Sequence, residues 1–310
     1  MSDVGTERDK INLMESVIDI VGVSKIYGKS VGIENVTLSV PKGSVYGFLG
    51  PNGAGKSTTI NLLLDLIRPT SGIINIFGLD VRKNGQAIRR RVGYLSSDLA
   101  LDGHLTGAQQ LQYFCQIHGN VDQKIVDQLV QRLGCQIDRK IKDLSRGNRQ
   151  KIGLVAALMH QPELLILDEP TSGLDPLIQA EFNKLIRDHK NSGGTTFMSS
   201  HVLSEVQEIC DQVAFVREGK LISEQTIEDL TKNTPRHLVL KGAKAELIAK
   251  LKKQPGISKL HQSSDKVTAL FSGQMPKLLK ILALHPPSDM TLAEADLETV
   301  FMSLYGDSNV

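Results

Sequence analysis

Apolar and polar positions follow two different patterns along the chain, and each pattern predicts a different kind of element. The runs 45–49 and 164–167 are wholly apolar, which is typical of strands covered on both faces of a sheet. Alternating or short apolar stretches predict further strands at 17–23, 33–40, 73–77, 92–95 and 193–200. Helical spacing predicts helices at 58–67 and 84–91 and over most of 106–161. We therefore expect an α/β core with an antiparallel β layer beside it and a helical subdomain at about 98–161.

The pattern changes after Ile227, and the last part of the chain has its own order of elements. Strands are predicted at 237–240, 257–262, 266–271 and 290–292, with helices at 244–253, 275–284 and 297–305. This order, β-α-β-β-α-β with a closing helix, is typical of a small ferredoxin-like α+β module, and it contains no recognisable catalytic group. We expect a leader over 1–16, a large domain over 17–232 and the module over 235–310.

A glycine-rich segment follows the first apolar run and leads into a predicted helix. It fits the pattern G-x-x-x-x-G-K-[ST] and reads Gly50-Pro51-Asn52-Gly53-Ala54-Gly55-Lys56-Ser57. Glycines let such a loop bend until its backbone N–H groups point inward at phosphate oxygens, and the helix adds its positive N-terminal end. In this pattern Lys56 reaches the β- and γ-phosphates, and the Ser57 hydroxyl is a ligand of Mg²⁺. The segment therefore predicts a P-loop nucleotide site.

Two acidic residues follow the second apolar run directly. Asp168 and Glu169 are thereby placed at the carboxyl edge of the sheet, where open α/β sheets bind their ligands. An aspartate at this place holds Mg²⁺ in P-loop proteins. His201 ends another predicted strand at the same edge. A lone histidine is usually structural, but this position suits a functional role equally well.

Composition limits the class of protein but does not indicate a particular function. The chain has 310 residues, of which 40% are hydrophobic and 23% charged, as in an ordinary globular protein of about two domains. The net charge of +2 is too small to indicate a strongly anionic partner, and we expect no nucleic acid to bind. The three cysteines, Cys115, Cys135 and Cys210, lack metal-ligand spacing and predict reduced thiols. We expect no signal peptide and no membrane span, so any crossing of a membrane falls to another chain.

A second motif follows the helical stretch. Leu144-Ser145-Arg146-Gly147-Asn148-Arg149-Gln150 precedes the Asp168 strand by about one helix, and Pro170-Thr171-Ser172-Gly173-Leu174-Asp175 follows Glu169. With the P-loop, this order resembles the ATP-binding cassette (ABC) ATPases, most of all the ATPase subunits of bacterial exporters for drugs, peptides or ions. The resemblance covers about 17–224, and the segment 297–301 resembles the C-terminal extension of that group more weakly.

The resemblance implies a P-loop NTPase fold of ABC type and a role for each site residue. Tyr27 stacks on adenine, and Asp168 holds Mg²⁺ through water beside Ser57. Glu169 polarises the attacking water and His201 contacts the γ-phosphate. The residues that wrap the phosphates of ATP are Gly50, Pro51, Asn52, Gly53, Ala54, Gly55, Lys56, Ser57 and Thr58.

The resemblance also implies partners. Ser145 and Gly147 bind the γ-phosphate of ATP held by a second cassette, and 172–175 touch that cassette. One chain then holds only half of each site, so two cassettes meet head to tail around two ATP molecules; a homodimer supplies this arrangement. Such a subunit drives a separately encoded membrane permease from the cytoplasmic face of the cell membrane.

Two departures from the family pattern stand out. The usual signature is Leu-Ser-Gly-Gly-Gln, whereas this chain has Arg146 and Asn148 at its third and fifth positions and keeps Ser145 and Gly147. Family members usually carry glutamine or glutamate where this chain has Ser97. That residue contacts the Mg²⁺ and water region and moves the helical subdomain, and we expect a serine to be too short for both. Asp98 is the candidate substitute.

Two other readings compete with the exporter subunit. The first is a soluble ABC ATPase acting on ribosomes or in DNA repair. Ribosome-acting members usually carry two cassettes and repair members a long coiled coil, whereas this chain shows one P-loop and no sustained heptads. The second is a non-hydrolysing ATP-binding regulator, which Glu169 argues against. The transported substrate is not encoded in any of these motifs.

Overall fold

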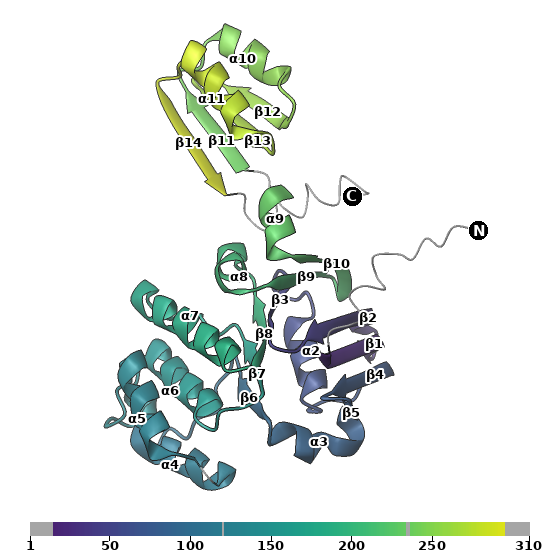
Figure 1. Ribbon diagram of the computed structural model, residues 1–310, viewed down its shortest axis with the longest axis vertical. Helices are drawn as coiled ribbons and strands as arrows, with labels where there is room; N and C mark the ends of the chain where they lie inside the picture. Colours follow the sequence, from purple (N-terminus) through teal and green to yellow (C-terminus); the bar gives the residue numbers. More distant parts are fainter. Residues whose placement is uncertain (1–14, 120, 234–235, 295–310) are drawn as a thin grey trace, which may run out of the picture. The chain divides into compact units, whose positions relative to one another are not determined.

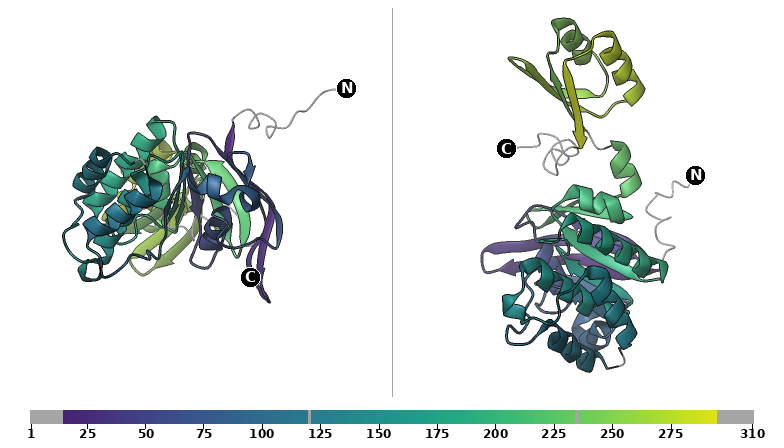
Figure 2. Two further views of the ribbon diagram at one scale, coloured as in Figure 1. Left: turned by 90° about the horizontal axis from the view of Figure 1, so that it is seen from below. Right: turned by 90° about the vertical axis from the view of Figure 1, so that its left-hand side faces the viewer.

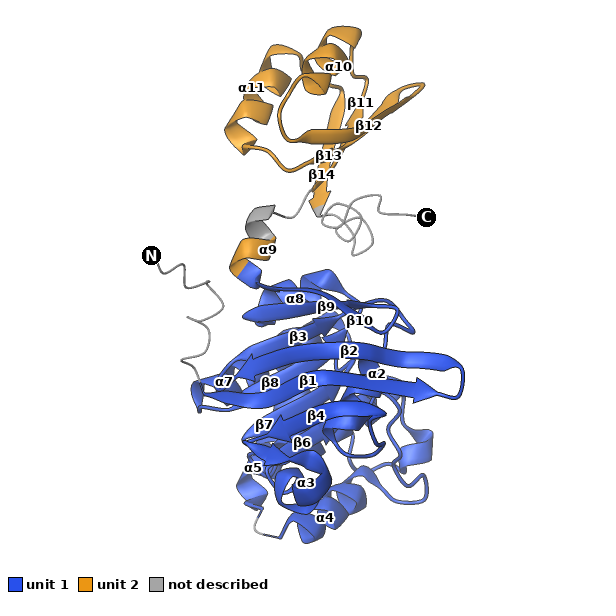
Figure 3. Cartoon of the chain, turned by 90° about the vertical axis from the view of Figure 1, so that its right-hand side faces the viewer, with its two compact units in different colours: residues 1–227 blue, residues 228–310 orange. Residues whose placement is uncertain are grey.

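The computed structural model describes residues 15–119, 121–233 and 236–294, which form two compact units. The first unit runs from Met1 to Ile227 and the second from Glu228 to Val310 (Figure 3). Helix α9 (Ile227–Asn233) starts the second unit, so the division falls earlier than the boundary predicted at residue 232. The predicted leader lies almost wholly outside the described residues.

The first sheet of unit 1 is the antiparallel layer that the sequence predicts. Its strand order is β2-β1-β4-β5, with bounds Ser16–Tyr27 (β1), Ser30–Pro41 (β2), Ser71–Ile76 (β4) and Leu79–Asp80 (β5). Strand β1 continues past the predicted end at residue 23 because register shifts against β2 absorb irregular positions such as Gly22, whose φ is 58°. Tyr27 therefore ends β1 and pairs with Ser30 across the turn at Gly28 and Lys29.

The second sheet has the order β10-β9-β3-β8-β7-β6 and carries the predicted α/β core. Strands β9, β3, β8, β7 and β6 are parallel, and β10 is antiparallel to β9. Every residue of β3 and β7 is buried, as the apolar runs predicted. The bounds are Val45–Leu49 (β3), Val92–Leu95 (β6), Leu164–Asp168 (β7), Thr195–Ser200 (β8), Gln212–Arg217 (β9) and Lys220–Thr226 (β10).

Helices cover both faces of this sheet. Helix α2 (Lys56–Leu63) lies between the two sheets, while α7 (Pro176–Asn191) and α8 (Leu203–Ile209) pack on the opposite face (Figure 1). The apolar side chains of α2 and of the facing strands form one core, with Ile60, Phe48 and Ile166 fully buried. Helix α2 ends at Leu63, before the predicted residue 67, because Asp65 adopts a left-handed backbone with φ 57°.

The predicted helical stretch 106–161 consists of three α-helices and a short 3₁₀ turn. They are α4 (Gly107–His118), α5 (Gln123–Leu133), η1 (Ile141–Asp143) and α6 (Arg146–Leu158), and they lie to one side of the sheets (Figure 2). Gly119 and Gly134 have positive φ and end α4 and α5. Helix α3 (Val81–Arg89) begins earlier than predicted because Asp80 caps it by accepting the backbone N–H of Arg82.

Unit 2 contains the predicted order of helices and strands. The strand order is β12-β13-β11-β14, and α10 and α11 supply the core residues Leu247, Leu251, Leu278 and Leu282 against the sheet. Bounds are Arg236–Lys241 (β11), Ala245–Lys252 (α10), Ile257–Ser263 (β12), Lys266–Phe271 (β13), Met275–Leu284 (α11) and Asp289–Glu294 (β14). The helix predicted at 297–305 lies outside the described residues. Among the helices that are described, none has the length and apolar character that a bilayer span requires.

Candidate functional site

The glycine-rich loop joins the carboxyl end of β3 to the N-terminus of α2. Gly55 has φ 103°, a conformation that L side chains rarely adopt, and a Cβ there would lie 2.7 Å from the carbonyl oxygen of Gly32. Only glycine fits this position, which turns the chain into α2. Pro51, Asn52, Gly53 and Ser57 are exposed at the loop, while Ala54 is buried beneath it. The loop therefore presents its backbone and the helix N-terminus outward, as phosphate binding requires.

Lys56 lies inside the loop. Its side chain is only 5% exposed, and its ammonium donates to the carbonyl oxygens of Gly50 at 2.8 Å and Pro51 at 3.1 Å. The same ammonium lies 3.3 Å from Oε1 of Glu169. These oxygen partners on several sides offset the cost of burying the ammonium. It is available to an anion that replaces one of those partners.

Asp168 receives three serine hydroxyls from three different segments. Ser57 and Ser97 donate to its Oδ2 at 2.8 and 2.9 Å, and Ser199 donates to its Oδ1 at 2.6 Å. The carboxylate is buried, with 2% of the residue exposed. These segments meet because β3, β8, β7 and β6 are neighbours and parallel, so their carboxyl ends share one sheet edge. Carboxylate and hydroxyl oxygens are the donors Mg²⁺ prefers, so Asp168 and Ser57 fit that ion.

Glu169 follows Asp168 with a left-handed backbone of φ 49°. Its Oε1 faces Lys56 at 3.3 Å, and its Oε2 lies 3.1 Å from Nδ1 of His201. The structure thus brings together the acidic pair, the loop lysine and the histidine that the sequence placed at separate strand ends. The Glu169 side chain is 22% exposed, so it can be reached by water while it holds both partners.

Ser97 differs from the expectation based on side-chain length. Its hydroxyl does reach Oδ2 of Asp168, because the segment after β6 brings the backbone close enough for a short side chain. Asp98 is exposed, and its backbone N–H donates to the Ser96 hydroxyl at 3.2 Å; its carboxylate has no partner within the described part of the chain. Ser97, and not Asp98, therefore makes the contact with Asp168 among the described residues.

The signature motif starts α6. Ser145 is the N-cap, and its Oγ accepts the backbone N–H of Asn148 at 3.2 Å. A Cβ on Gly147 would lie 2.5 Å from the carbonyl oxygen of Gly173, so only glycine lets these segments approach. Arg146 donates to the Ser172 hydroxyl at 3.1 Å. Among the described residues, no hydrogen bond joins Ser145 or Gly147 to the 50–57 loop.

Asn148, which stands at the usual glutamine position of the signature, has a structural contact instead. It is buried and exchanges two hydrogen bonds with the backbone of Gln136, at 2.9 and 3.1 Å. Those bonds join α6 to the loop after α5. The departure from the family pattern is therefore accommodated within the helical part of unit 1.

Tyr27 lies at the end of β1 with 47% of its surface exposed. A Cβ on Gly32 would lie 2.9 Å from its ring and 3.1 Å from the methyl group of Thr58, which places the ring close to the start of α2. The ammonium of Lys25 lies 5.1 Å from the ring centroid. The ring is accessible beside the loop, as stacking on a base requires.

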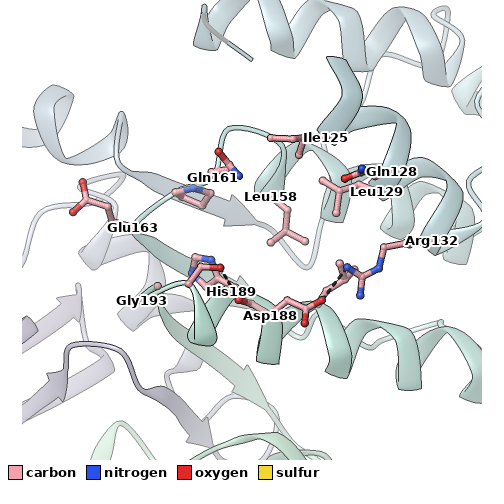
Figure 4. Close-up of a pocket in the computed structure, with 14 residues that line it drawn as sticks. Ile125, Gln128, Leu129, Arg132, Leu158, Gln161, Glu163, Asp188, His189 and Gly193 are labelled. Atoms are coloured by element: carbon pink, nitrogen blue, oxygen red, sulfur yellow. Dashed lines mark hydrogen bonds and ion pairs between the residues drawn. The ribbon is translucent and has the colours of Figure 1, made fainter. Parts of the chain in front are cut away.

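A separate pocket of about 470 Å³ lies at the opposite edge of the sheet. Its lining includes Glu163 and Gly194, which precede β7 and β8, and the ends of α5 and α7 (Figure 4). Arg132 in its wall is already paired, with Glu181 at 2.6 Å and Asp188 at 2.9 Å. This pocket is therefore remote from the phosphate loop. The charge of Arg132 is already compensated by two carboxylates, so Arg132 is not a free cation for binding a phosphate group.

Sequence reasoning missed Ser199 and mistook the reach of Ser97. Ser199 was visible only as one of several small residues in a predicted strand. The signal that could have identified it is its position two residues before His201 on a strand neighbouring that of Asp168. Register across a parallel sheet is set by the fold and is not readable from local pattern.

Comparisons with known proteins agree with this geometry. A family model described as ABC transporter matches residues 33–172. The bacitracin transport ATP-binding protein BcrA of Bacillus licheniformis is 34% identical over 305 residues, which cover 96% of this chain and 100% of BcrA. BcrA of Enterococcus faecalis is 36% identical over 242 residues, covering 77% of this chain and 79% of that protein.

A solved structure, titled an ATP-binding subunit of an ABC transporter, superimposes with a TM-score of 0.63 at 27% identity. It covers 70% of this chain and 92% of that chain. The curated relatives share the sequence, and the solved structure shares the architecture over 70% of the chain. The chain therefore belongs to the ABC transporter family, as an ATP-binding and ATP-hydrolysing subunit.

Proposed function

We propose that this chain is the ATPase subunit of an exporter, that it works as a dimer, and that it drives a separately encoded membrane permease. The observation that supports this most directly is the meeting of Lys56, Asp168, Glu169 and His201 at one sheet edge. Glu169 is the group placed to polarise a water, because its carboxylate is partly exposed and held by two partners.

The residues of this chain divide the work. Backbone N–H groups of 50–57 and the Lys56 ammonium bind the phosphates of ATP, and Tyr27 stacks on the adenine. Ser57 and Asp168 would hold Mg²⁺, which supplies charge neutralisation on the phosphates when bound. Glu169 accepts a proton from the attacking water, and His201 holds Glu169 in place and contacts the γ-phosphate.

Dimerisation is proposed because the signature motif does not contact the phosphate loop of its own chain among the described residues. Ser145 and the N-terminus of α6 have no hydrogen bond to the 50–57 loop among the described residues, so a second copy is the natural source of their phosphate. Leu177, at the start of α7 beside the 172–175 turn, is 79% exposed. We propose a homodimer with two ATP molecules at the seam.

The permease is proposed from the family and from relatives named for bacitracin transport. On this proposal the subunit lies on the cytoplasmic face of the membrane, attached through the permease. Bacitracin is the first cargo to test. A soluble ABC ATPase without a transport partner is the competing outcome.

The test is phosphate release by the purified full chain in Mg-ATP, alone and together with the membrane protein proposed as its permease. We expect turnover that chelation of Mg²⁺ abolishes, and a tolerance of cells to bacitracin that requires both chains and an intact Glu169. Turnover without any dependence of tolerance on the membrane protein would leave an ATPase and refute bacitracin export. No turnover in either preparation would refute the ATPase assignment of the site.

A further inference from the structure

Ser199 contacts both acidic residues of the site with one hydroxyl. Its Oγ donates to Oδ1 of Asp168 at 2.6 Å and accepts the backbone N–H of Glu169 at 3.0 Å. A serine hydroxyl is both donor and acceptor, so the two bonds are compatible. Ser199 is fully buried, which shields both bonds from competition by water.

The position of this hydroxyl is set by the sheet. Ser199 on β8 is the register partner of Asp168 on the parallel strand β7. Its side chain therefore stays against the end of β7 whatever the exposed loops do. The contact is a fixed part of the core and does not depend on a bound ligand.

The bond to Glu169 compensates an unusual backbone. Glu169 has φ 49°, a left-handed conformation that is uncommon for a residue with a side chain. Its N–H would be left without a partner in the interior if Ser199 did not accept it, and an unpaired buried donor is costly. By accepting this N–H, Ser199 fixes the orientation of the peptide. That orientation in turn determines where the Glu169 side chain begins.

The two oxygens of Asp168 have different surroundings. Ser199 binds Oδ1 from the interior, whereas Ser57 and Ser97 bind Oδ2 from the side of the loop. Since Ser57 is the proposed Mg²⁺ ligand, Oδ2 is the oxygen that faces the metal side. Holding Oδ1 prevents rotation of the carboxylate and keeps Oδ2 aimed outward.

We propose that Ser199 is a positioning residue that sets the orientation of Asp168 toward Mg²⁺ and of Glu169 toward water. This inference rests on the proposed ATPase function. It assigns to β8 a role in the site separate from that of His201. Ser199 is fully buried, so it acts through the Asp168 carboxylate and the Glu169 backbone N–H that it contacts.

The test compares three variants of Ser199 with a matched control in the full chain. Ser199→Ala removes both bonds, Ser199→Cys keeps the volume but hydrogen-bonds weakly, and Ser199→Thr restores the hydroxyl. The control is Thr196→Val on the same strand. Thr196 is fully buried, and its hydroxyl has no partner within the part of the chain that is described.

Three readouts separate positioning from mere stability. The first is hydrogen exchange of the Glu169 amide in nucleotide-free protein; we expect Ser199→Ala and Ser199→Cys to accelerate it by about tenfold or more. The second is the Mg²⁺ concentration needed for half-maximal binding of fluorescent ATP, which should rise by about tenfold, while ATP affinity in EDTA stays within about twofold. The third is steady-state turnover, where kcat should fall and KM should not.

Ser199→Thr should recover the Mg²⁺ dependence, and Thr196→Val should match the wild-type chain in all three readouts. The inference is overturned if Ser199→Ala and Ser199→Cys lower only the melting temperature, with the exchange and Mg²⁺ curves of the wild type. If Ser199→Ala does not fold, Ser199→Cys carries the same comparison. An inactive wild type would count against the proposed function, whereas the exchange measurement would still decide the role of Ser199.

Discussion

The Glu169 carboxylate lies 3.3 Å from the Lys56 ammonium, across the mouth of the phosphate loop, while its second oxygen faces His201 at 3.1 Å. A lysine of this loop serves the phosphates of a nucleotide. The Glu169 carboxylate is therefore paired with the ammonium that we propose binds the phosphates. On the proposed function, the phosphates of ATP displace the Glu169 carboxylate from Lys56, and the carboxylate then becomes available to polarise water.

Substitution of Glu169 should nearly abolish turnover. Glu169→Gln keeps the shape of the side chain but loses the carboxylate, and loss of a general base typically lowers kcat by about a hundredfold or more. The ATP-bound dimer should accumulate, which size exclusion with and without ATP would detect. Glu163→Gln is the matched control, because Glu163 is exposed at the other edge of the sheet and pairs with Arg91. Normal turnover in Glu169→Gln would refute the role given to Glu169.

The same variant should bind ATP more tightly. The amide carries no charge to attract Lys56, so the phosphates no longer displace a carboxylate from the ammonium. We expect the dissociation constant for ATP, measured without Mg²⁺ by fluorescence titration, to fall by about threefold or more. An unchanged or weaker affinity would mean that the Lys56–Glu169 pair does not compete with the nucleotide.

Ser97 should matter more than Asp98. Ser97→Ala removes a hydroxyl bound to the buried Asp168, and losing a hydrogen bond to a charged group costs about 1.5–3 kcal/mol in favourable cases, or about tenfold or more in turnover. Asp98→Ala removes an exposed carboxylate and should leave turnover within about twofold. Steady-state ATPase at saturating Mg-ATP compares them. The reverse order would restore the argument from side-chain length that favoured Asp98.

A chain that ends at Asn233 should keep its nucleotide site. The site residues all lie in unit 1, which has its own core, and compact units of this size commonly fold alone. We expect ATP affinity within about twofold of the full chain, since unit 2 supplies no residue to the described site. We propose that unit 2 is regulatory or supports the dimer; retained folding by circular dichroism together with lost nucleotide binding would instead show that unit 2 takes part in binding.

The stability of the fold should fall in mild acid because of His160. Burial and the stacked ring of His118, 3.9 Å away between centroids, lower the pKa of His160 to about 4. The pKa of a histidine in the unfolded chain is about 6.5. Below that pH the unfolded chain binds a proton at His160, whereas the folded chain does not until the pH approaches 4. The free energy of unfolding should therefore decrease as the pH falls through 6.5 toward 4.

Urea denaturation between about pH 7 and pH 5 measures this effect. His160→Asn should reduce the slope of stability against pH, while His118 and His189, whose pKa values burial also lowers, keep part of it. His104→Asn, at an exposed histidine, serves as the control and should leave the slope unchanged. Equal slopes for His160→Asn and the wild type would show that His160 does not carry the effect.

Much of the architecture was readable from local pattern. The apolar runs at 45–49 and 164–167 predicted β3 and β7, because strands buried on both faces need apolar side chains throughout. The glycine-rich segment and the residues after it predicted the loop and α2. The positive φ that Gly55 can adopt and the lysine that follows it are both properties of the local sequence. The order of elements in unit 2 followed from the same periodicities.

Tertiary structure alone decided which side chains meet. Ser57, Ser97 and Ser199 lie far apart in the chain and converge on Asp168 because β3, β8, β7 and β6 are neighbours in one parallel sheet. Side-chain length could not predict the contact of Ser97, since reach depends on where the backbone passes. The sequence by itself determined the elements and the chemical groups, whereas strand order and register determined the distances, because nothing local in a chain encodes which strands lie side by side.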